Sequence, residues 1–360
     1  MPLYLTKRIL LIFPTLFLIM LINFLIIQTA PGGPVEQFLA KLNNANHATN
    51  EAAAIDVVNH NIIAAAADAK YRGAQGIDPE IIKKIEQLYG FDLPLWKRFW
   101  IMMKKFLLFD FGNSFYQDKK VVDLVLEKLP VSISLGLWTT LLVYLISIPL
   151  GIKKAVNDGS KFDFWSSMVV SIGHAIPSFL FAIFLIVLFA GGNFWNIFPL
   201  RGLVSEGFSQ MTWWQKILDY FWHLTLPIIA MVVGGFASLT FFCKNSFLEE
   251  INKQYVLTAY AKGLSRKQVL YNHVFRNAMM IVIAGIPAAF IGILFTGSML
   301  IEIIFSLNGI GLMGYEAALS RDYPVMFGTL YCFTLIGLVV NIISDLTYKM
   351  VDPRINFARF

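Results

Sequence analysis

The residues of this chain whose types and spacing suit chemistry lie mainly in one charged interval, Lys244 to Asn277, between two strongly apolar segments. Within it, Glu249 to Lys262 contains no Pro or Gly and ends on a cation, and Gly263 follows at once. This order is typical of a helix C-terminus. These residues suit the binding of another protein, because a capped helix with polar side chains can dock onto a partner without any reacting group.

A second helix is predicted directly after this glycine. Ser265 and Gln268 have the spacing of a capping box, and Leu264 and Val269 occupy the two positions of a hydrophobic staple. The second helix is therefore expected to begin at Arg266.

Small side chains precede the glycine. Ala259 and Ala261 carry almost no side chain, so the backbone there can approach a cleft on another protein closely. An ordinary connector between two membrane spans would explain the same caps and charges equally well. The spacing alone leaves both interpretations open.

Catalytic and metal chemistry have little support. His47 and His60 have no supporting Cys or carboxylate cluster, so we interpret them as surface histidines. Cys243 and Cys332 have no paired spacing, so neither a disulfide framework nor a metal site is predicted. The sequence contains no GxxxxGK[ST] loop, no Ser-His-Asp arrangement and no HExxH motif, so we expect a protein that is not an enzyme and binds no cofactor itself.

The elements that carry this interval are predicted to lie in a membrane. The mean hydropathy is +0.64, 57% of the residues are apolar and only 14% are charged, against about 25% charged in soluble domains. A span needs about 20 apolar residues. Six stretches are long enough: Ile9 to Thr29, Ile133 to Ile152, Ser167 to Ala190, Leu224 to Cys243, Met279 to Ile301 and Val325 to Thr347. Buried helices of a soluble protein would not repeat such runs six times, and the first run is too long for a signal peptide.

The distribution of Lys and Arg predicts the orientation. With the N-terminus inside, most cations outside the long first loop are cytoplasmic, and the short outer loops carry only Arg201, Lys216 and Arg321. Both termini and the interval Lys244 to Asn277 then face the cytoplasm. Topology alone explains the net charge of +6, so no nucleic acid is expected as a partner.

The long loop after the first span divides by composition. Asn43 to Gln75 is rich in Ala and Asn and is interpreted as an irregular insertion. Asp78, followed by Pro79, opens a predicted helix that runs through Tyr89. Leu95 to Leu108 interleaves aromatic and basic residues, which is typical of a helix at the membrane interface.

The interval also matches a known family. The segment Tyr255 to Leu264, YVLTAYAKGL, followed by His273 and Arg276-Asn277-Ala278, resembles the coupling loop of binding-protein-dependent ABC importers, and is closest to the peptide-importing branch. In that family the loop places a short coupling helix in a groove on a cytoplasmic ATPase. The resemblance assigns this role to one set of residues: Tyr255, Thr258, Ala259, Ala261, Lys262, Gly263, Leu264, Arg276 and Asn277. Leu257 and Thr258 replace the Glu and the first Ala of the general motif.

Further landmarks extend the resemblance over nearly the whole chain. They are Pro31 to Pro34, Tyr89 to Pro94, Asp110 to Ser114, Ile176 to Phe179, His223 to Pro227, Glu302 to Gly311, Arg321 to Val325 and Val351 to Arg354. They are most similar to the first permease subunit of the microcin C and oligopeptide-type importers of Gram-negative bacteria. The implied fold is an all-α integral membrane protein with six transmembrane helices, the type I ABC importer permease fold, and a large periplasmic loop.

Three regions follow from this comparison: an anchor with the first span at 1–30, a periplasmic loop domain at 31–132 with its insertion near 43–75, and a five-helix permease core at 133–360 with the coupling loop at 244–278. The resemblance implies a bacterial inner membrane location and four kinds of partner besides the lipid bilayer: a second homologous permease, one or more cytoplasmic ABC ATPases that bind ATP and Mg²⁺, a periplasmic substrate-binding protein and a peptide-like substrate.

The translocation path has a weaker signal. His174, Pro177 and Ser178 in the third span, and Gly234, Gly235 and Ser238 in the fourth, interrupt apolar helices and could line a path. Small residues serve helix packing at least as often, and His174 alone is better interpreted as a hydrogen-bonded interior residue. The spans show no buried charges of the kind that a proton relay needs.

Two alternatives to a peptide permease remain. One is a permease of the same fold for another substrate class, such as nickel or an oligosaccharide. The other is a membrane scaffold that docks an ATPase without transport.

Overall fold

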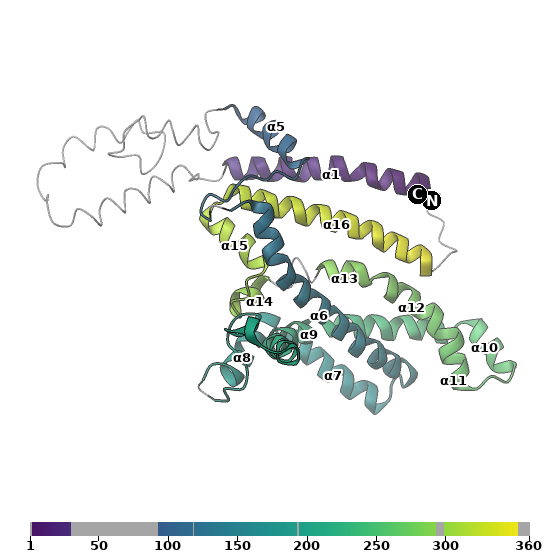
Figure 1. The fold of residues 1–360 in the computed structure, drawn as a ribbon. Helices are drawn as coiled ribbons and strands as arrows, with labels where there is room; N and C mark the ends of the chain where they lie inside the picture. Colours follow the sequence, from purple (N-terminus) through teal and green to yellow (C-terminus); the bar gives the residue numbers. More distant parts are fainter. Residues whose placement is uncertain (1, 30–92, 118, 193, 293–298, 352–360) are drawn as a thin grey trace, which may run out of the picture. The chain divides into compact units, whose positions relative to one another are not determined.

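The computed structural model describes residues 2–29, 93–117, 119–192, 194–292 and 299–351. In these ranges the chain forms helices, and the one β-type pairing is an isolated bridge between Asn113 and Lys120 (Figure 1). The predicted all-α class is confirmed. The predicted insertion 43–75 and the predicted helix from Asp78 to Tyr89 lie outside the described residues.

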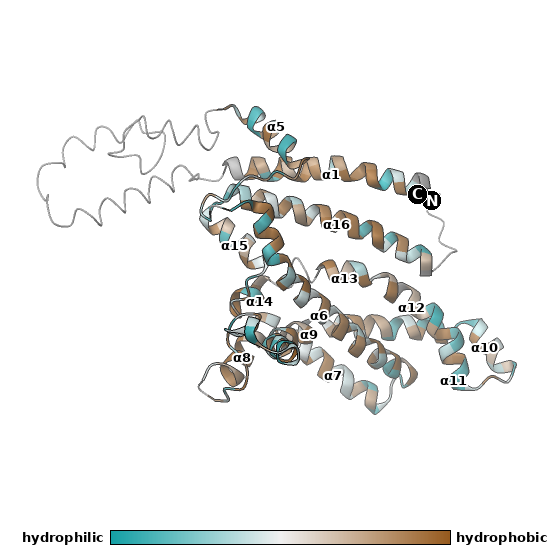
Figure 2. Cartoon of the chain, in the orientation of Figure 1, coloured by the Kyte–Doolittle hydropathy of each residue, from teal (hydrophilic) through white to brown (hydrophobic). Residues whose placement is uncertain are grey.

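Five helical stretches of the described residues are long and apolar enough to cross a membrane. They are α1 (Pro2–Thr29), α6 (Val121–Val156), α9 (Trp213–Ile251), the run Arg266–Gly292 and α16 (Tyr323–Val351). The run consists of α11 (Arg266–Val269), a π-helical turn (Leu270–Val274), α12 (Phe275–Ala284) and α13 (Ile286–Gly292). Figure 2 shows hydrophobic residues along most of these helices, whereas hydrophilic residues gather on α5 and α11.

The third predicted span is bent. Ser167 to Ala190 was expected to form one helix, but the structure has α7 (Lys161–Ala175) and α8 (Ser178–Phe189), which meet at 89°. Between them Ile176 has an extended backbone and Pro177 lacks the N–H that would continue the helical ladder. The bent pair counts as the sixth span if it crosses the membrane as one unit.

The chain divides into two compact units. Unit 1 comprises 1–10, 125–315 and 333–360, and unit 2 comprises 11–124 and 316–332. In unit 1, α6, α8, α9 and α14 (Met299–Ile304) share one hydrophobic core. Its most deeply buried side chains are Leu135, Ala182, Leu224, Ala230, Ile301 and Leu307.

Unit 1 also buries a carboxyl group that the sequence placed near the end of a span. Glu302 is 0% exposed, and its carboxyl group accepts hydrogen bonds from the Ser132 hydroxyl and the Leu312 N–H, both at 2.8 Å. A Cβ added at Gly309 would lie 2.4 Å from Glu302 Cδ, so only glycine fits there. Glu302 follows the predicted span Met279 to Ile301, and its burial, which the sequence did not predict, is possible because neighbouring donors satisfy its carboxyl group.

Unit 2 contains α5 (Leu95–Phe106), the helix predicted at Leu95 to Leu108. Its buried face of Phe99, Met103 and Phe106 packs with aromatic rings of unit 2, among them Phe17 at 5.4 Å between ring centroids. Asp322 accepts hydrogen bonds from the Ser114 hydroxyl and the Phe115 N–H. These bonds connect the landmark Arg321 to Val325 with the landmark Asp110 to Ser114. The helix is confirmed, and its place at the membrane interface remains a prediction.

Candidate functional site

The first helix boundary within the charged interval Lys244 to Asn277 differs from the prediction. One helix was predicted over Glu249 to Lys262, but α9 continues to Ile251, and a separate helix α10 (Gln254–Ala261) follows. Lys253 is extended between them, and the Asn252 side chain donates a hydrogen bond to the Leu248 carbonyl. Asn is a weak helix former, and Asn252 is the C-cap of α9, so Asn252 is the residue in the sequence that agrees with the break. Residues 244–251 belong to the α9 helix.

The junction after α10 confirms the sequence prediction. Gly263 has φ of 82°, its N–H bonds the Tyr260 carbonyl at 2.9 Å, and the Leu264 N–H bonds the Ala259 carbonyl at 3.3 Å. These two bonds form a Schellman motif, which requires the left-handed conformation at the glycine. The turn thus fixes the direction in which the chain leaves α10.

The start of α11 is also as predicted. The Ser265 hydroxyl accepts from the Gln268 N–H, and Gln268 Oε1 accepts from the Ser265 N–H at 2.9 Å. This capping box starts α11 at Arg266. Val269 is 1% exposed and packs in the same hydrophobic cluster as Leu264, which agrees with a staple. Figure 1 shows α10 and α11 together, next to α12.

Helix α10 has two different faces. Val256 and Ala259 are 2% and 6% exposed and pack in a cluster with α9 and α12, whereas Leu257 is 67% and Tyr260 is 43% exposed. The small side chain of Ala259 therefore packs α10 onto its own chain, and the predicted approach of this backbone to another protein stays a prediction. The outward face consists of Leu257, Thr258, Tyr260, Ala261 and Lys262.

Polar contacts hold this element to the helices beside it. The Tyr255 hydroxyl donates to Glu250 Oε2 at 2.7 Å and is also hydrogen-bonded by Asn277. Burial, with the hydrogen bond to Glu250, raises the pKa of Tyr255, so its phenol keeps the proton it donates. Arg266 Nη2 donates to the Val156 carbonyl at 2.9 Å, at the end of α6. Arg276 and Asn277 are exposed beside this contact network.

The residues predicted for the translocation path do not gather into one cavity. His174 and Ser238 are exposed on α7 and α9, and Ser178 lies against Gly234, where an added Cβ would be 3.2 Å from Ser178 Cβ. The interpretation of His174 as an interior residue is wrong, because it stands on the last turn of α7 before the bend at Pro177. The path assignment remains a prediction.

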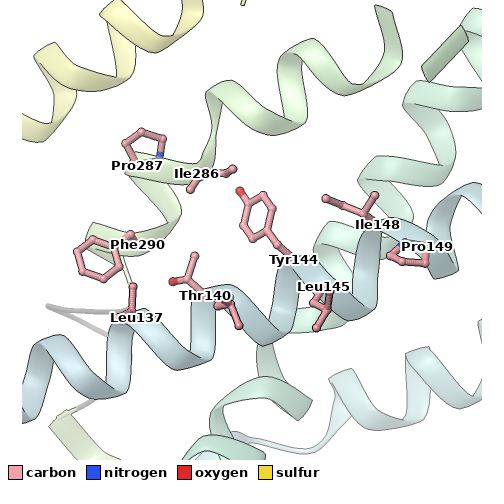
Figure 3. Close-up of a pocket in the computed structure, with 10 residues that line it drawn as sticks. Leu137, Thr140, Tyr144, Leu145, Ile148, Pro149, Ile286, Pro287 and Phe290 are labelled. Carbon is pink, nitrogen blue, oxygen red and sulfur yellow. The ribbon is translucent and has the colours of Figure 1, made fainter. Parts of the chain in front are cut away.

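A separate hollow of about 750 Å³ lies between α6 and α13 (Figure 3). Its lining is apolar apart from the hydroxyl groups of Thr140 and Tyr144. Figure 3 shows the Tyr144 ring reaching from α6 towards Ile286. Because no charged side chain lines the hollow, it offers nothing to the charged ends of a peptide, and we assign it no substrate contact.

Sequence reasoning missed a group of buried charges that joins α6, α7 and α9. Lys154 was expected on a cytoplasmic loop but is 0% exposed at the end of α6, and Asp163 near the start of α7 is 7% exposed. The spacing of these residues carries no signal for a pair, because their contact depends on how α6 and α7 turn back on each other.

Comparison with known proteins supports, over most of the chain, the importer permease family that the sequence resembles. A family model described as "Binding-protein-dependent transport system inner membrane component" matches residues 147–357. The chain is 57% identical over 358 residues to the peptidoglycan transport system permease protein YejB of Agrobacterium fabrum (strain C58), covering 99% of this chain and 98% of that one. It is 30% identical over 363 residues to the oligopeptide transport system permease protein AppB of Bacillus subtilis (strain 168), covering 99% and 100%.

A solved structure is similar in fold. The inward-facing MetNI methionine ABC transporter matches with a TM-score of 0.50 and 16% identity, over 64% of this chain and 97% of that one. At this identity the match concerns the fold alone, and it agrees with the type I importer permease fold predicted from the sequence.

Proposed function

Since the chain belongs to the family of binding-protein-dependent inner membrane transport components, we propose that it is the permease subunit of an ATP-driven importer of peptides or peptide-like compounds. The substrate class rests on its relatives, which are named as peptidoglycan and oligopeptide transport permeases. The microcin C type named from the sequence falls within this class. The chain itself supplies helices and a docking element, and we expect it to contribute no reacting group.

The observation that carries the coupling role is the geometry of α10. Its inner face is buried in its own chain while Leu257 and Tyr260 on its outer face are exposed. Exposed apolar and aromatic side chains on a rigid helix are typical of a protein-binding surface. We assign this face to a cytoplasmic ATPase, which binds ATP and Mg²⁺ in our proposal.

The remaining partners follow from the same assignment. Six spans are few for a peptide-sized path, so a second homologous permease is expected to complete it. A periplasmic binding protein delivers the substrate to the outer loops. Both termini lie in the cytoplasm in this topology, as the cation distribution predicts.

The cycle that we propose is mechanical. ATP binding closes the ATPase subunits, α10 moves with them, and the spans tilt so that the path opens to one side of the membrane and then to the other. The capped turn at Gly263 and the hydrogen bonds of Tyr255 and Arg266 keep α10 from moving independently of α6, α9 and α12.

Affinity purification of the tagged chain from mild detergent, with mass spectrometry of its companions, tests the proposal. We expect a second permease and an ATPase in stoichiometric amounts. Leu257→Glu should lower ATPase recovery by about tenfold or more, because a central apolar contact of an interface is worth about 2 kcal/mol.

Leu218→Glu is the matched control, since Leu218 is 69% exposed and lies on the predicted outer side. The control should recover the ATPase normally. Recovery of the wild-type chain without an ATPase, from intact membranes and in several detergents, would refute the coupling role.

A further inference from the structure

A buried ion cluster joins the cytoplasmic ends of three helices in unit 1. Lys154 Nζ of α6 lies 3.0 Å from Asp163 Oδ1 of α7, and Lys244 Nζ of α9 lies 2.7 Å from Asp163 Oδ2. Lys244 also pairs with Asp158 at 2.7 Å in the turn between α6 and α7. One carboxylate therefore holds α6, α7 and α9 together.

The hydrogen bonds of Lys154 fix it to α7 in one geometry. Its ammonium group donates to the Asp163 carbonyl at 3.0 Å, to the Ser166 hydroxyl at 3.0 Å and to the Ser167 hydroxyl at 2.6 Å. An ammonium group has three N–H donors, so these acceptors use all of them. Asp163 Oδ1 forms an ion pair with this ammonium group, and it accepts no hydrogen bond among the described residues.

Fold stability alone does not account for this arrangement. Burying an ion pair costs several kcal/mol in desolvation, and apolar side chains of similar volume often stabilise a fold equally well. What the cluster adds is a specific relative position of the three helix ends, because hydrogen bonds to a buried charge are directional.

The cluster adjoins the coupling element. Ala155, next to Lys154, packs in the same hydrophobic cluster as Val256 and Ala259 of α10. Arg266 of α11 donates its hydrogen bond to Val156, the following residue of α6. A displacement of α10 and α11 therefore reaches the last turn of α6, where Lys154 holds α7.

The other end of α7 is the bend of 89° at Ile176 and Pro177. The helical hydrogen-bond ladder is interrupted there, so α7 can tilt relative to α8 at little cost. His174 and Ser178, two residues predicted for the translocation path, flank this bend.

We propose that Lys154, Asp163 and Lys244 form the joint that transmits the movement of the coupling element to α7 and so to the bent span. This inference rests on the proposed function of α10 as the ATPase-docking helix. Lys154 is a positioning residue in it, and breaking the joint should uncouple ATP hydrolysis from transport while the ATPase stays bound.

The test uses the complete complex in proteoliposomes, with ATP hydrolysis and peptide uptake measured on the same sample. Lys154→Met keeps the volume of the side chain and leaves Asp163 paired with Lys244. The peptide taken up per ATP hydrolysed should fall by about tenfold, a typical magnitude for a coupling between two sites. ATPase recovery on purification should equal that of the wild type.

Lys153→Met is the matched control, because Lys153 is the exposed neighbour and lies over the Phe162 ring instead of in the cluster. It should leave the ratio unchanged. If Lys154→Met does not insert, the Ser166→Ala/Ser167→Ala double variant removes two acceptors of Lys154 without changing any charge, and it should lower the ratio in the same way.

Three outcomes are distinguishable. Wild-type coupling in the Lys154→Met and serine variants would overturn the joint and leave the proposed function intact. Loss of ATPase binding in these variants would also overturn it, because the cluster would then act on docking. A wild-type complex that hydrolyses ATP without moving peptide would refute the proposed function itself.

Discussion

Gly263 turns the chain between α10 and α11 at a φ of 82°, where nothing lies within 4 Å of an added Cβ. A substitution there therefore acts through backbone strain alone. The left-handed conformation costs an L-residue about 1–2 kcal/mol, and more for a β-branched side chain, whereas Asn adopts it readily.

Gly263→Val is accordingly expected to loosen the turn and lower ATPase recovery in the co-purification assay, with normal membrane insertion. Gly263→Asn is the control and should bind the ATPase as the wild type does. Equal recovery with both variants would show that the conformation of this turn is irrelevant to docking.

Glu302 supports a different prediction. Glu302→Ala leaves the Ser132 hydroxyl and the Leu312 N–H without their acceptor, and unpaired buried groups cost about 1–3 kcal/mol each. We expect a clear fall in the thermal unfolding midpoint of the purified chain, measured by intrinsic fluorescence in detergent.

Glu316→Ala removes an exposed carboxyl group from α15 (Ile310–Ser320) and should leave that midpoint unchanged. A normal midpoint for Glu302→Ala would show that water or another group replaces the lost acceptor.

At this scale, the sequence predicted residues whose role is local. Gly263, Ser265 and Gln268 were found because caps depend on residues within one turn. The burial of Ala259, Lys154 and Glu302 depends on segments far away in the chain, and no spacing rule reports it.

Among the elements, α10 and α11 are short, so their stability depends on the capping interactions at their ends. An isolated helix of this length is marginal in water, so the capping box and the packing against α9 and α12 hold α11 in place. Ser265→Ala removes one capping oxygen, which costs about 1 kcal/mol.

We therefore expect faster amide hydrogen exchange at 266–269 in Ser265→Ala, measured by mass spectrometry, and unchanged exchange in α9. Thr258→Ala removes a similar hydroxyl from the exposed face of α10 and serves as control. Identical exchange in the wild type and in Ser265→Ala would mean that packing alone orders α11.

The element boundaries show where sequence reasoning reached its limit. Apolar run length located the five long apolar helices and the bent pair α7 and α8, yet it missed the bend at Pro177 and the break at Asn252. Both signals are single residues, which a hydropathy average over about 20 residues removes.

For the whole molecule, the central expectation is its orientation in the membrane. The cation distribution places α10 inside and the loop between α8 and α9 outside. A chain with Cys243 and Cys332 replaced by Ala allows single-cysteine labelling with a membrane-impermeant maleimide. Gln210→Cys should react in spheroplasts, and Lys262→Cys should react only in inverted vesicles, since both positions are exposed. The reverse pattern would invert the topology and exclude a cytoplasmic ATPase at α10.

The most direct measurement is peptide accumulation in proteoliposomes that contain this chain, the second permease and the ATPase, with binding protein outside and ATP enclosed. The account predicts uptake that requires internal ATP and falls about tenfold in Leu257→Glu, while Leu218→Glu transports normally. Uptake without ATP, or wild-type uptake in Leu257→Glu, would contradict coupling through α10.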